Sequence, residues 1–429
     1  MQAQALLFIL ISLTVCLASG IWIGVSLFIV SLSSMYLFLD LPVEKILSAM
    51  MWNVTNSSIL LALPLFILMG DILVKTKIST QLFKGLTPWV SRIPGGLLQI
   101  NVLASALFAA ISGSVAATTA AVGKITIPEL EKRGYDPKLI IGSLASAGTL
   151  GILIPPSMPM LVYGIVANVS IGQMFVAGLV PGIFLMALFS LYVGLRDPGF
   201  KQRKGEIFSR REWAMSLLQV TPTVTLISAV LGSIYMGWST PTEAAAIGVG
   251  GAILIGLLFR SLSVREMIEI LKSTTSTSSM IIMILIGASF ISTALGFLGI
   301  PKYLCRLVLG SNVSPLVVMT LITLVYLFLG CLIDGFSMIV MTVPIFMPII
   351  SAFGFSPIWF GIYIVLLIQI ANITPPVGFN LFLISGITPY SVVQIAKWSF
   401  PFLLLMLAFI ILVIAFPSII TYLPTIAFM

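Results

Sequence analysis

Two double prolines, in Gly-Ile-Leu-Ile-Pro-Pro-Ser (151–157) and Ala-Asn-Ile-Thr-Pro-Pro-Val-Gly (371–378), interrupt two long apolar runs of the sequence. Each run is long enough for a membrane-spanning helix, which needs about 20 apolar residues. Proline has no amide N–H, so a proline inside a helix releases the carbonyl four residues earlier. The two stretches therefore predict two membrane helices that are broken partway along.

The two stretches also occupy equivalent positions of an internal repeat. When the chain is shifted by 220 residues, prolines and glycines coincide without a gap. The pairs are Pro128 with Pro348, Gly134 with Gly354, Pro137 with Pro357, Pro155 with Pro375, Pro156 with Pro376 and Pro181 with Pro401. Proline and glycine make up only 24 and 35 of the 429 residues, so a duplication explains the pairs better than chance accumulation of prolines in an apolar bundle.

The composition places the whole chain in a bilayer. Hydrophobic residues make up 59% of the sequence and charged residues 8%, and the mean hydropathy is +1.19. These values exclude a water-soluble surface. We expect an all-α polytopic membrane protein with about ten crossings. The predicted spans are 3–18, 21–39, 52–74, 138–166, 173–195, 214–237, 242–260, 275–299, 357–385 and 398–425.

Two further apolar stretches have interruptions that favour re-entrant helical hairpins. The stretch 96–128 is interrupted by Ser112-Gly113-Ser114, and the stretch 315–350 is interrupted by Asp334-Gly335. The arm from Val115 to Pro128 would reach only about 21 Å, which is less than a hydrocarbon core of about 30 Å. A hairpin that enters and leaves on one side fits this length better than two full crossings.

Positive charge predicts the orientation of the chain, because cytoplasmic loops are enriched in Lys and Arg. Basic residues flank the first hairpin and fill the loop 196–212, whereas the flanks of the second hairpin hold only Lys302 and Arg306. The first hairpin should enter from the cytoplasm and the second from outside, with the N-terminus outside. Oppositely oriented copies are inverted-topology repeats, which many secondary transporters use.

The predicted organisation has four parts. They are N-terminal scaffold helices (1–74), repeat 1 with hairpin 96–128 and broken helix 138–166 (75–195), a basic cytoplasmic loop with scaffold or arm helices (196–299), and repeat 2 with hairpin 315–350, broken helix 357–385 and a last helix (300–429).

The broken helices and hairpin tips carry oxygen ligands for a hard cation such as Na⁺. The double prolines release the carbonyls of Gly151 and Ile152 in one half and of Ala371 and Asn372 in the other. Broken helix in a membrane is tolerated only inside protein or around a cavity. The nearby candidate side chains are Ser112, Ser114, Thr149, Asn372 and Thr374. The alternative is that hydroxyls bond back to their own helix and the prolines only kink it.

Asp334 stands at the interruption of the second hairpin. An acid in mid-membrane costs about 2.5–3.5 kcal/mol on insertion scales and usually has a function. We expect it to bind or organise a cation, and the alternative is a structural cap on a half-helix.

Several enzyme classes are excluded by the residues that the sequence lacks. It contains no histidine, which excludes Ser-His-Asp triads and His-bearing zinc sites. It also has no phosphate-binding loop of the GxxxxGK[ST] type. Cys16, Cys305 and Cys331 have no metal-ligand spacing. We expect a protein that is not an enzyme, holds no cofactor, and takes its energy from a gradient or a partner, with Na⁺ as the only metal.

Five motifs in order resemble the large membrane subunit of the tripartite ATP-independent periplasmic (TRAP) transporters. They are Ser-Gly-Ser-Val-Ala-Ala-Thr (112–118), Arg-Gly-Tyr-Asp-Pro (133–137), Gly-Ile-Leu-Ile-Pro-Pro-Ser (151–157), Thr-Pro-Thr-Glu-Ala-Ala (240–245) and Thr-Pro-Pro-Val-Gly (374–378). The likeness runs essentially from end to end.

This resemblance implies an elevator-type, sodium-driven importer of organic acids of the sialic acid or C4-dicarboxylate class, in the bacterial inner membrane. It implies two partners, a small four-helix membrane subunit and a periplasmic substrate-binding protein. It also implies one sodium site at the first tip and break, a mirror site at the second, and substrate contacts from Ser114 and Ser157. The implied sodium residues are Ser112, Gly113, Ser114, Gly151, Ile154 and Pro155, and Asp334, Gly335, Ala371, Thr374 and Pro375.

Two other readings stay open at this point. A self-sufficient sodium/dicarboxylate symporter would share the paired hairpins but need no binding protein. A polytopic membrane enzyme such as an intramembrane protease would turn over without a gradient, but the missing histidine and the single mid-membrane aspartate argue against its zinc and two-aspartate forms.

Overall fold

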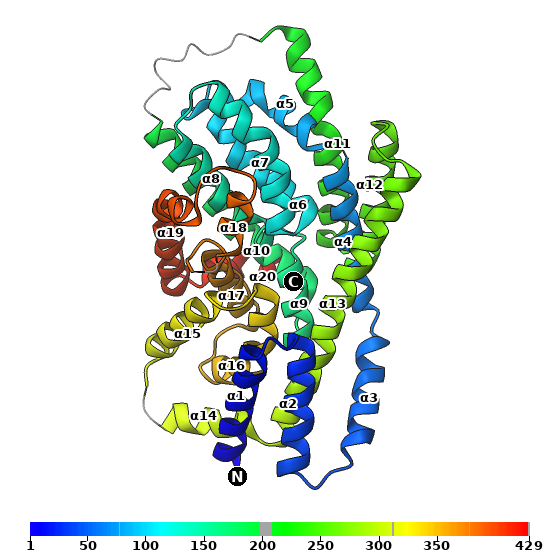
Figure 1. Cartoon of the computed structure of the whole chain (residues 1–429), viewed down its shortest axis with the longest axis vertical. Coiled ribbons are helices and arrows are strands. Elements are labelled where there is room, and N and C mark those ends of the chain that lie inside the picture. The colour runs from blue at the N-terminus through cyan, green and yellow to red at the C-terminus, as the bar shows by residue number, and fades with distance from the viewer. Residues whose placement is uncertain (77, 198–207, 311–312, 377, 428–429) are drawn as a thin grey trace.

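The computed structural model describes residues 1–76, 78–197, 208–310, 313–376 and 378–427, which form an elongated helical protein (Figure 1). Of the basic residues that predict orientation, Lys77, Lys201, Arg203 and Lys204 lie outside the described residues. The helices in chain order are α1 (Gln2–Ala18), α2 (Ile23–Phe38), α3 (Val43–Thr55), α4 (Ile59–Lys75), α5 (Ile78–Val90), η1 (Gly96–Leu98), α6 (Gln99–Ser112), α7 (Val115–Lys132), α8 (Pro137–Gly148), η2 (Thr149–Ile152), α9 (Met158–Ala167), α10 (Ile171–Arg196), α11 (Arg210–Tyr235), α12 (Pro241–Leu258), α13 (Val264–Phe297), α14 (Ile300–Gly310), α15 (Pro315–Gly330), α16 (Gly335–Ala352), α17 (Pro357–Ala371), α18 (Phe379–Ser385), α19 (Val392–Ala415) and α20 (Ser418–Ala427).

The long apolar helices confirm a polytopic membrane protein. Within the described residues, α10, α11, α12, α13, α16 and α19 are each long and apolar enough to cross a membrane. The pair α3 and α4, bent by 50°, would make a seventh span. The ten predicted spans also count α1 and α2, which have only 17 and 16 residues, and the two broken helices. Length and composition together therefore support fewer crossings than the sequence predicts.

Three predicted spans have wrong boundaries. The span 52–74 bends where α3 ends and α4 begins. The span 275–299 is too short, because Ser263 and Glu266 form a capping box that starts α13 at Val264. The span 398–425 divides into α19 and α20 around Pro417, whose missing N–H cannot continue the first helix.

Each predicted hairpin is present as two helices joined by a short turn. Gly113 and Ser114 connect α6 to α7, and residues 331–334 connect α15 to α16. Figure 1 places the first pair in the upper half of the molecule and the second pair in the lower half. The arm length predicted from Val115 to Pro128 is wrong, because α7 continues through Pro128 to Lys132. By its length and composition, α16 could also cross a membrane.

The two double prolines break their helices as predicted. In the first half, α8 passes into the 3₁₀ turn η2, and α9 starts only after Ser157. In the second half, α17 ends at Ala371 and α18 starts at Phe379. The preceding turns match as well, since Gly134 and Gly354 have φ of +73° and +76°, in the left-handed region that favours glycine.

Two helices that the sequence did not predict, α5 and α14, each precede a hairpin. Both alternate apolar and polar residues with the helical period, so neither forms a run of 20 apolar residues. A search for membrane spans therefore passes over them.

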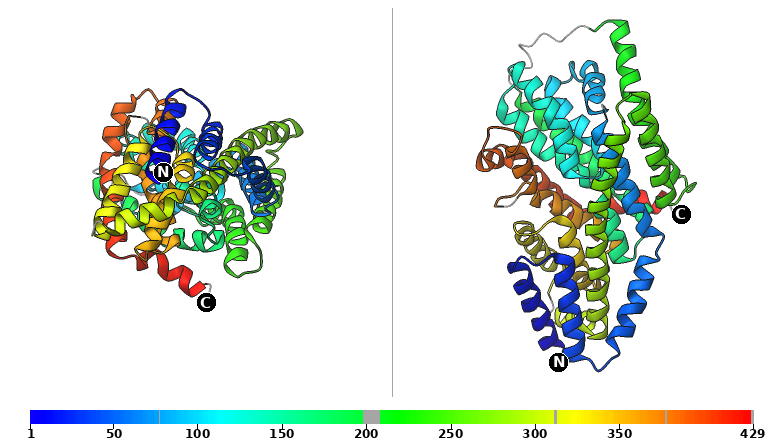
Figure 2. Two further views of the ribbon diagram at one scale, coloured as in Figure 1. Left: turned by 90° about the horizontal axis from the view of Figure 1, so that it is seen from below. Right: turned by 45° about the vertical axis from the view of Figure 1, so that its right-hand side comes forward.

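One flank of the molecule consists of α13, which packs against α2 and α4, and of α12, which packs against α4 (Figures 1 and 2). Gly24 and Gly287 allow α2 and α13 to touch backbone to backbone, because a Cβ on Gly287 would lie 2.8 Å from the Gly24 carbonyl oxygen. Thr274 of α13 donates a hydrogen bond of 2.9 Å to Asp71 of α4.

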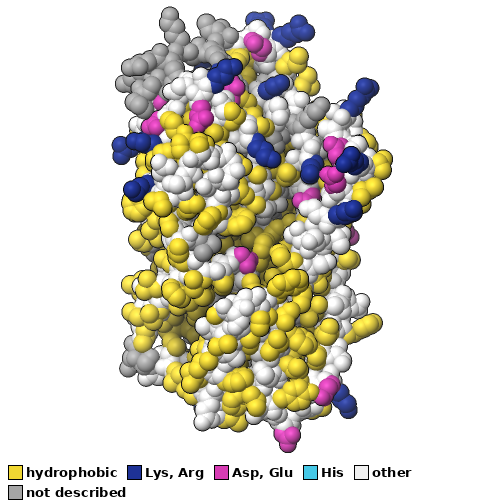
Figure 3. Space-filling view, in the orientation of Figure 1, with side chains coloured by type: hydrophobic (Ala, Val, Ile, Leu, Met, Phe, Trp, Pro, Cys, Tyr) yellow, Lys and Arg dark blue, Asp and Glu magenta, His cyan; other side chains and the backbone are white. Residues whose placement is uncertain are grey.

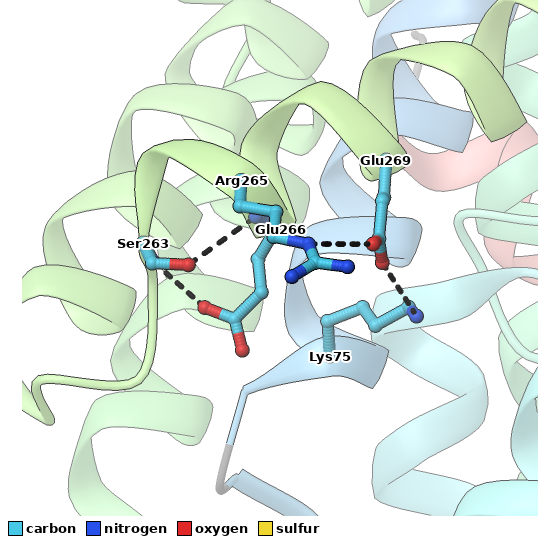
Figure 4. Close-up of polar contacts among 5 residues, drawn as sticks. All are labelled: Lys75, Ser263, Arg265, Glu266 and Glu269. Carbon is cyan, nitrogen blue, oxygen red and sulfur yellow. Dashed lines mark hydrogen bonds and ion pairs between the residues drawn. The ribbon is translucent and has the colours of Figure 1, made fainter.

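At the end of α4, the Lys75 ammonium lies 3.9 Å from the Glu269 carboxylate, beside the Ser263–Glu266 capping box (Figure 4). Arg265 lies 3.7 Å from the same carboxylate. Both ion pairs are exposed, so they contribute little to stability.

Similar capping boxes start three other helices, α11, α12 and α19. They pair Ser209 with Glu212, Thr240 with Glu243, and Ser391 with Gln394. Each box satisfies two helix N–H groups with side chains only three residues apart.

Charge is distributed unevenly along the molecule. Lys and Arg side chains gather over the upper part of the face in Figure 3, while the N-terminus lies at the lower end in Figure 1. This distribution agrees with the predicted orientation, in which the upper end faces the cytoplasm.

Candidate ion and substrate site

The first hairpin tip lies directly against the first helix break. A Cβ added to Gly151 would lie 2.7 Å from the Ser114 carbonyl oxygen, and one added to Gly113 would lie 2.6 Å from the Pro156 carbonyl oxygen. Glycine is required at both positions for the backbones to approach this closely. Five predicted sodium residues of this half, Ser112, Gly113, Ser114, Gly151 and Pro155, thus belong to one contact region.

The hydroxyls of the first tip are engaged within the tip. Ser112 Oγ lies 2.9 Å from Thr118 Oγ1, and Ser114 caps α7 by accepting a hydrogen bond from the Ala117 N–H. Ser112 is only 4% exposed, whereas Ser114 is partly exposed. Ser114 is therefore the tip hydroxyl that a ligand could reach without a rearrangement.

The first break is buried and holds Thr149 and Ser157, both also predicted as site residues. The Thr149 hydroxyl donates to the Ser146 carbonyl at 2.7 Å and is fully buried. The Ser157 hydroxyl donates to the Ile152 carbonyl at 2.5 Å, and Ser157 is 1% exposed. A substrate could contact Ser157 only after this region opens. Ile154, the last predicted sodium residue here, is partly buried and packs on Gly182 of α10.

The second hairpin tip is arranged around Asp334. Its carboxylate accepts hydrogen bonds from the N–H groups of Phe336 (2.9 Å) and Ser337 (3.2 Å), and also from the Ser337 hydroxyl. Asp334 is thus the N-cap of α16, which is the structural role considered as the alternative. It is also exposed, and a carboxylate has further lone pairs, so capping does not prevent it from binding a cation.

The second tip also lies against the break of its own half. A Cβ on Gly335 would lie 2.5 Å from Ile368, and one on Gly330 would lie 2.2 Å from the Ala371 Cβ. The Cys331 thiol lies 3.5 Å from the Pro375 carbonyl oxygen. This contact brings the predicted residues Asp334, Gly335, Ala371 and Pro375 to one region.

The amide of Asn372 and the hydroxyl of Thr374 bond back to their own helix. They donate to the carbonyls of Ile368 (2.8 Å) and Ile370 (2.7 Å). This is the pattern expected when polar residues only support a kink. Their acceptor lone pairs are still available to a cation.

Three of the four carbonyls that the prolines release have found new donors. Ile152 accepts from the Ser157 hydroxyl, Ala371 from the Thr374 N–H, and Asn372 from the Asn380 N–H. These bonds occupy one lone pair each and leave the other for a ligand. In the described part of the chain, no group of three or more His, Cys, Asp and Glu side chains could hold a metal. A cation at the tips would therefore rely mainly on neutral oxygen atoms.

The sequence did not identify three residues of this region. Gly70 of α4 lies against the first tip, because its Cβ would be 3.2 Å from the Ser112 backbone. Thr118 pairs with Ser112, and Asn380 of α18 reaches into the first half. Only Asn380 carried a recognisable signal, since a buried amide in an apolar membrane segment needs a partner.

Two hairpins whose tips meet broken helices inside a long apolar bundle define a multi-pass membrane transport protein. The family follows from a match of residues 10–419 to the model of the tripartite ATP-independent periplasmic transporter, DctM component, and the chain belongs to this family. It is therefore a TRAP transporter subunit in the inner membrane, and not an enzyme. Membership implies a periplasmic binding protein and a small membrane partner.

Curated relatives support the family over nearly the full length. The C4-dicarboxylate TRAP transporter large permease protein DctM of Rhodobacter capsulatus is 30% identical over 421 residues, covering 95% of this chain and 96% of the relative. The sialic acid TRAP transporter large permease protein SiaM of Vibrio cholerae serotype O1 is 30% identical over 416 residues, with the same coverage. Among solved structures, the YdaH transporter of Alcanivorax borkumensis aligns with a TM-score of 0.62 at 15% identity, covering 87% of this chain and 89% of that one, which supports the fold alone.

Proposed function

We propose that this chain is the large subunit of a sodium-driven importer that takes an organic acid from a periplasmic binding protein and moves it into the cytoplasm. The observation that carries the proposal is the duplicated contact between each hairpin tip and the helix break of its own half. Irregular backbone inside a membrane is stable only where protein or a cavity satisfies its polar groups. Two such regions, each rich in carbonyl and hydroxyl oxygens, suit two sodium ions.

The proposed sodium sites use oxygen-bearing residues of each hairpin tip and its helix break. Site 1 would combine the first tip and break, with Ser112, Ser114, Thr149 and Gly151 supplying oxygens. Site 2 would combine the second tip and break, with Asp334, Ala371, Asn372 and Thr374 supplying oxygens. Hard cations prefer such oxygen ligands. Gly113, Ile154, Pro155, Gly335 and Pro375 would shape the backbone around them.

The proposed substrate is a carboxylate of the sialic acid or C4-dicarboxylate class. The support is that relatives named for C4-dicarboxylates are 30–34% identical to this chain, and a relative named for sialic acid is 30% identical. Ser114 is the favoured contact because its hydroxyl is partly exposed, whereas that of Ser112 at the same tip is buried. Helix N-termini at Ser114 and Asp334 start α7 and α16 at the two tips, and their partial positive charge would favour an anion between them.

The proposed movement is of the elevator type, in which hairpins and broken helices slide as one body against a scaffold. The packing supports this division, because α2, α4, α12 and α13 form one flank. The flank meets the hairpins through α4, whose Gly70 lies against Ser112, and through α13, which packs on α16. Packed helices can slide past one another in shear movements.

The test is uptake into proteoliposomes that hold this chain with its small membrane subunit. Radiolabelled sialic acid, and separately a C4-dicarboxylate, is offered outside with candidate binding protein under an inward sodium gradient. We expect uptake that requires both sodium and binding protein.

Two outcomes would contradict parts of the proposal. Uptake without any binding protein would indicate a self-sufficient symporter. Uptake that is unchanged when potassium replaces sodium on both sides would remove the sodium coupling.

A further inference from the structure

Asn380 ties the two halves of the molecule together at the level of both helix breaks. Its side-chain amide donates a hydrogen bond of 2.5 Å to the Ala145 carbonyl, across 235 residues of sequence. Its backbone N–H donates to the Asn372 carbonyl at 3.0 Å. Asn380 is fully buried, so neither bond competes with water.

Each of these two carbonyls lacks its usual donor from the same helix because of the helix break in its own half. Pro376 has no N–H, so the Asn372 carbonyl loses the donor that a continuous helix would supply. In the first half, α8 changes to the tighter 3₁₀ pattern at Thr149. The Thr149 N–H therefore bonds to Ser146 and Ala147 and leaves Ala145 without its α-helical donor. Within the described residues, Asn380 supplies a donor to a carbonyl at each of the two breaks.

The surroundings of Asn380 fix its position. Gly148 has no side chain, and a Cβ there would lie 3.2 Å from Asn380 Nδ2 and 1.9 Å from Thr119 Oγ1. The α18 helix therefore seats directly on the last turn of α8. The oxygens Thr119 Oγ1 and Asn380 Oδ1 are buried without a protein partner, so the amide is held through its N–H groups alone.

We propose that Asn380 is a positioning residue that couples the two sodium sites, so that an ion bound at one break favours binding at the other. This inference rests on the proposed sodium sites. An ion bound at the second break would fix the Asn372 carbonyl and, through its bond to the Asn380 N–H, the start of α18, and the Asn380 amide would pass this effect to Ala145 and the start of η2. Coupling between sites is reciprocal, so an ion at the first break would favour the second equally.

The test replaces Asn380 by leucine, which has a similar size but donates no hydrogen bond. Sodium is titrated while uptake is measured in proteoliposomes, and also while thermal unfolding is measured in detergent, which reports binding without transport. For the wild type we expect a Hill coefficient approaching about 2, and for Asn380→Leu a value near about 1, with apparent sodium affinity at least about fivefold weaker.

Asn101 offers a matched control because its side chain donates to the same helix, α8. Its amide is also buried and donates to a carbonyl of α8, that of Ile140 at 2.9 Å, but it comes from α6 of the same half. Asn101→Leu should lower thermal stability yet leave the Hill coefficient of the wild type. A Hill coefficient lowered equally in both variants, or unchanged in Asn380→Leu, would overturn the coupling.

A second measurement keeps Asn380 and tests the coupling even when the Asn380→Leu variant does not fold. Hydrogen exchange of the amides at 149–154 is followed against sodium in the wild type and in Thr374→Val, which alters only the second break. Coupling predicts that protection of the first break needs at least about fivefold more sodium in the variant. Identical sodium dependence would refute the coupling. A wild type that responds to no sodium in any assay would instead refute the proposed function itself.

Discussion

The two hairpin tips use the same backbone devices in opposite surroundings. At the first tip and break, Ser112, Thr149 and Ser157 are 4%, 0% and 1% exposed. At the second, Asp334 and Pro375 are exposed, and Thr374 is only partly buried. Both halves have a double proline, a polar N-cap and a tip that touches its break, so the difference comes from other helices.

Two helices approach the first tip and break through glycines, whereas their repeat equivalents α13 and α19 pack near the second without such glycine contacts. Gly70 brings α4 against the first tip, while Gly178 and Gly182 bring α10 against Leu153 and Ile154. The close contacts of Gly330 and Gly335 stay within their own half. A duplicated backbone can therefore give one buried and one open region.

The largest expected effect concerns access to the two regions. In a variant without native cysteines, single cysteines at Leu332 and Ser157 should react with a water-soluble maleimide at rates that differ about a thousandfold. Leu332 is 59% exposed, whereas Ser157 is 1% exposed and would react only through local opening. Labelling rates in detergent test this, with the unfolded protein as the control for intrinsic reactivity. Equal rates would show that the first region is as open as the second.

Gly151→Ala should sharpen the contrast by changing the close backbone contact between the first tip and the first break. The new Cβ would lie 2.7 Å from the Ser114 carbonyl oxygen, so the tip and break must separate. We expect uptake to fall by about a hundredfold, since displacements near 1 Å have such effects on reacting geometry. Gly250→Ala in α12, where nothing lies within 4 Å, is the control and should keep full uptake. Normal uptake by Gly151→Ala would mean that the contact is not needed.

Asp334→Asn removes the negative charge at the second hairpin tip but keeps a side chain that can cap α16. Asparagine caps a helix about as well as aspartate, so stability should change little. If the carboxylate helps to bind sodium, the apparent sodium affinity for uptake should fall about tenfold, which corresponds to about 1.4 kcal/mol. Asp136→Asn is the matched control, because Asp136 is an exposed N-cap of α8 away from both tips. Sodium dependence that is unchanged in Asp334→Asn would leave the residue with its capping role only.

The smallest expected effect is a difference in the free energy of unfolding between two variants, one at each tip or break, measured without sodium. Ser112→Ala should lower the free energy of unfolding by about 1–2 kcal/mol, because Thr118 would lose its buried partner. Thr374→Val should change it by less than about 0.5 kcal/mol, because this hydroxyl is partly exposed. Thermal unfolding in detergent compares the two. A larger loss in Thr374→Val would reverse the assignment of the buried and the open region.

The sequence predicted those parts of the fold that depend on local chemistry. Pro155 and Pro375 interrupt their helices whatever surrounds them, and Gly113 ends α6 with a φ of +58°. Such residues act through their own backbone, so their effects can be inferred from a single sequence. The tip residues and the breaks were therefore assigned to the correct segments.

The unpredicted features depend on partners that are distant in sequence. Burial of Ser157 results from helices packed around it, and the bond from Asn380 to Ala145 spans 235 residues. The start of α13 could have been predicted from the sequence, because Ser263 and Glu266 have the spacing of a capping box. The span was instead defined by the apolar run, and the box lies outside that run. The amphipathic helices α5 and α14 were not predicted, because neither contains a long apolar run.

The capping boxes have a consequence for how the protein is made. The helices α11, α12, α13 and α19 carry their start signals within four consecutive residues, so the signals are complete as soon as each segment leaves the ribosome. The Ala145 carbonyl, in contrast, must wait until 235 further residues have been synthesised before Asn380 can reach it. During translation the flank helices can therefore form before the two breaks are joined, and the link between the halves is among the last contacts to close.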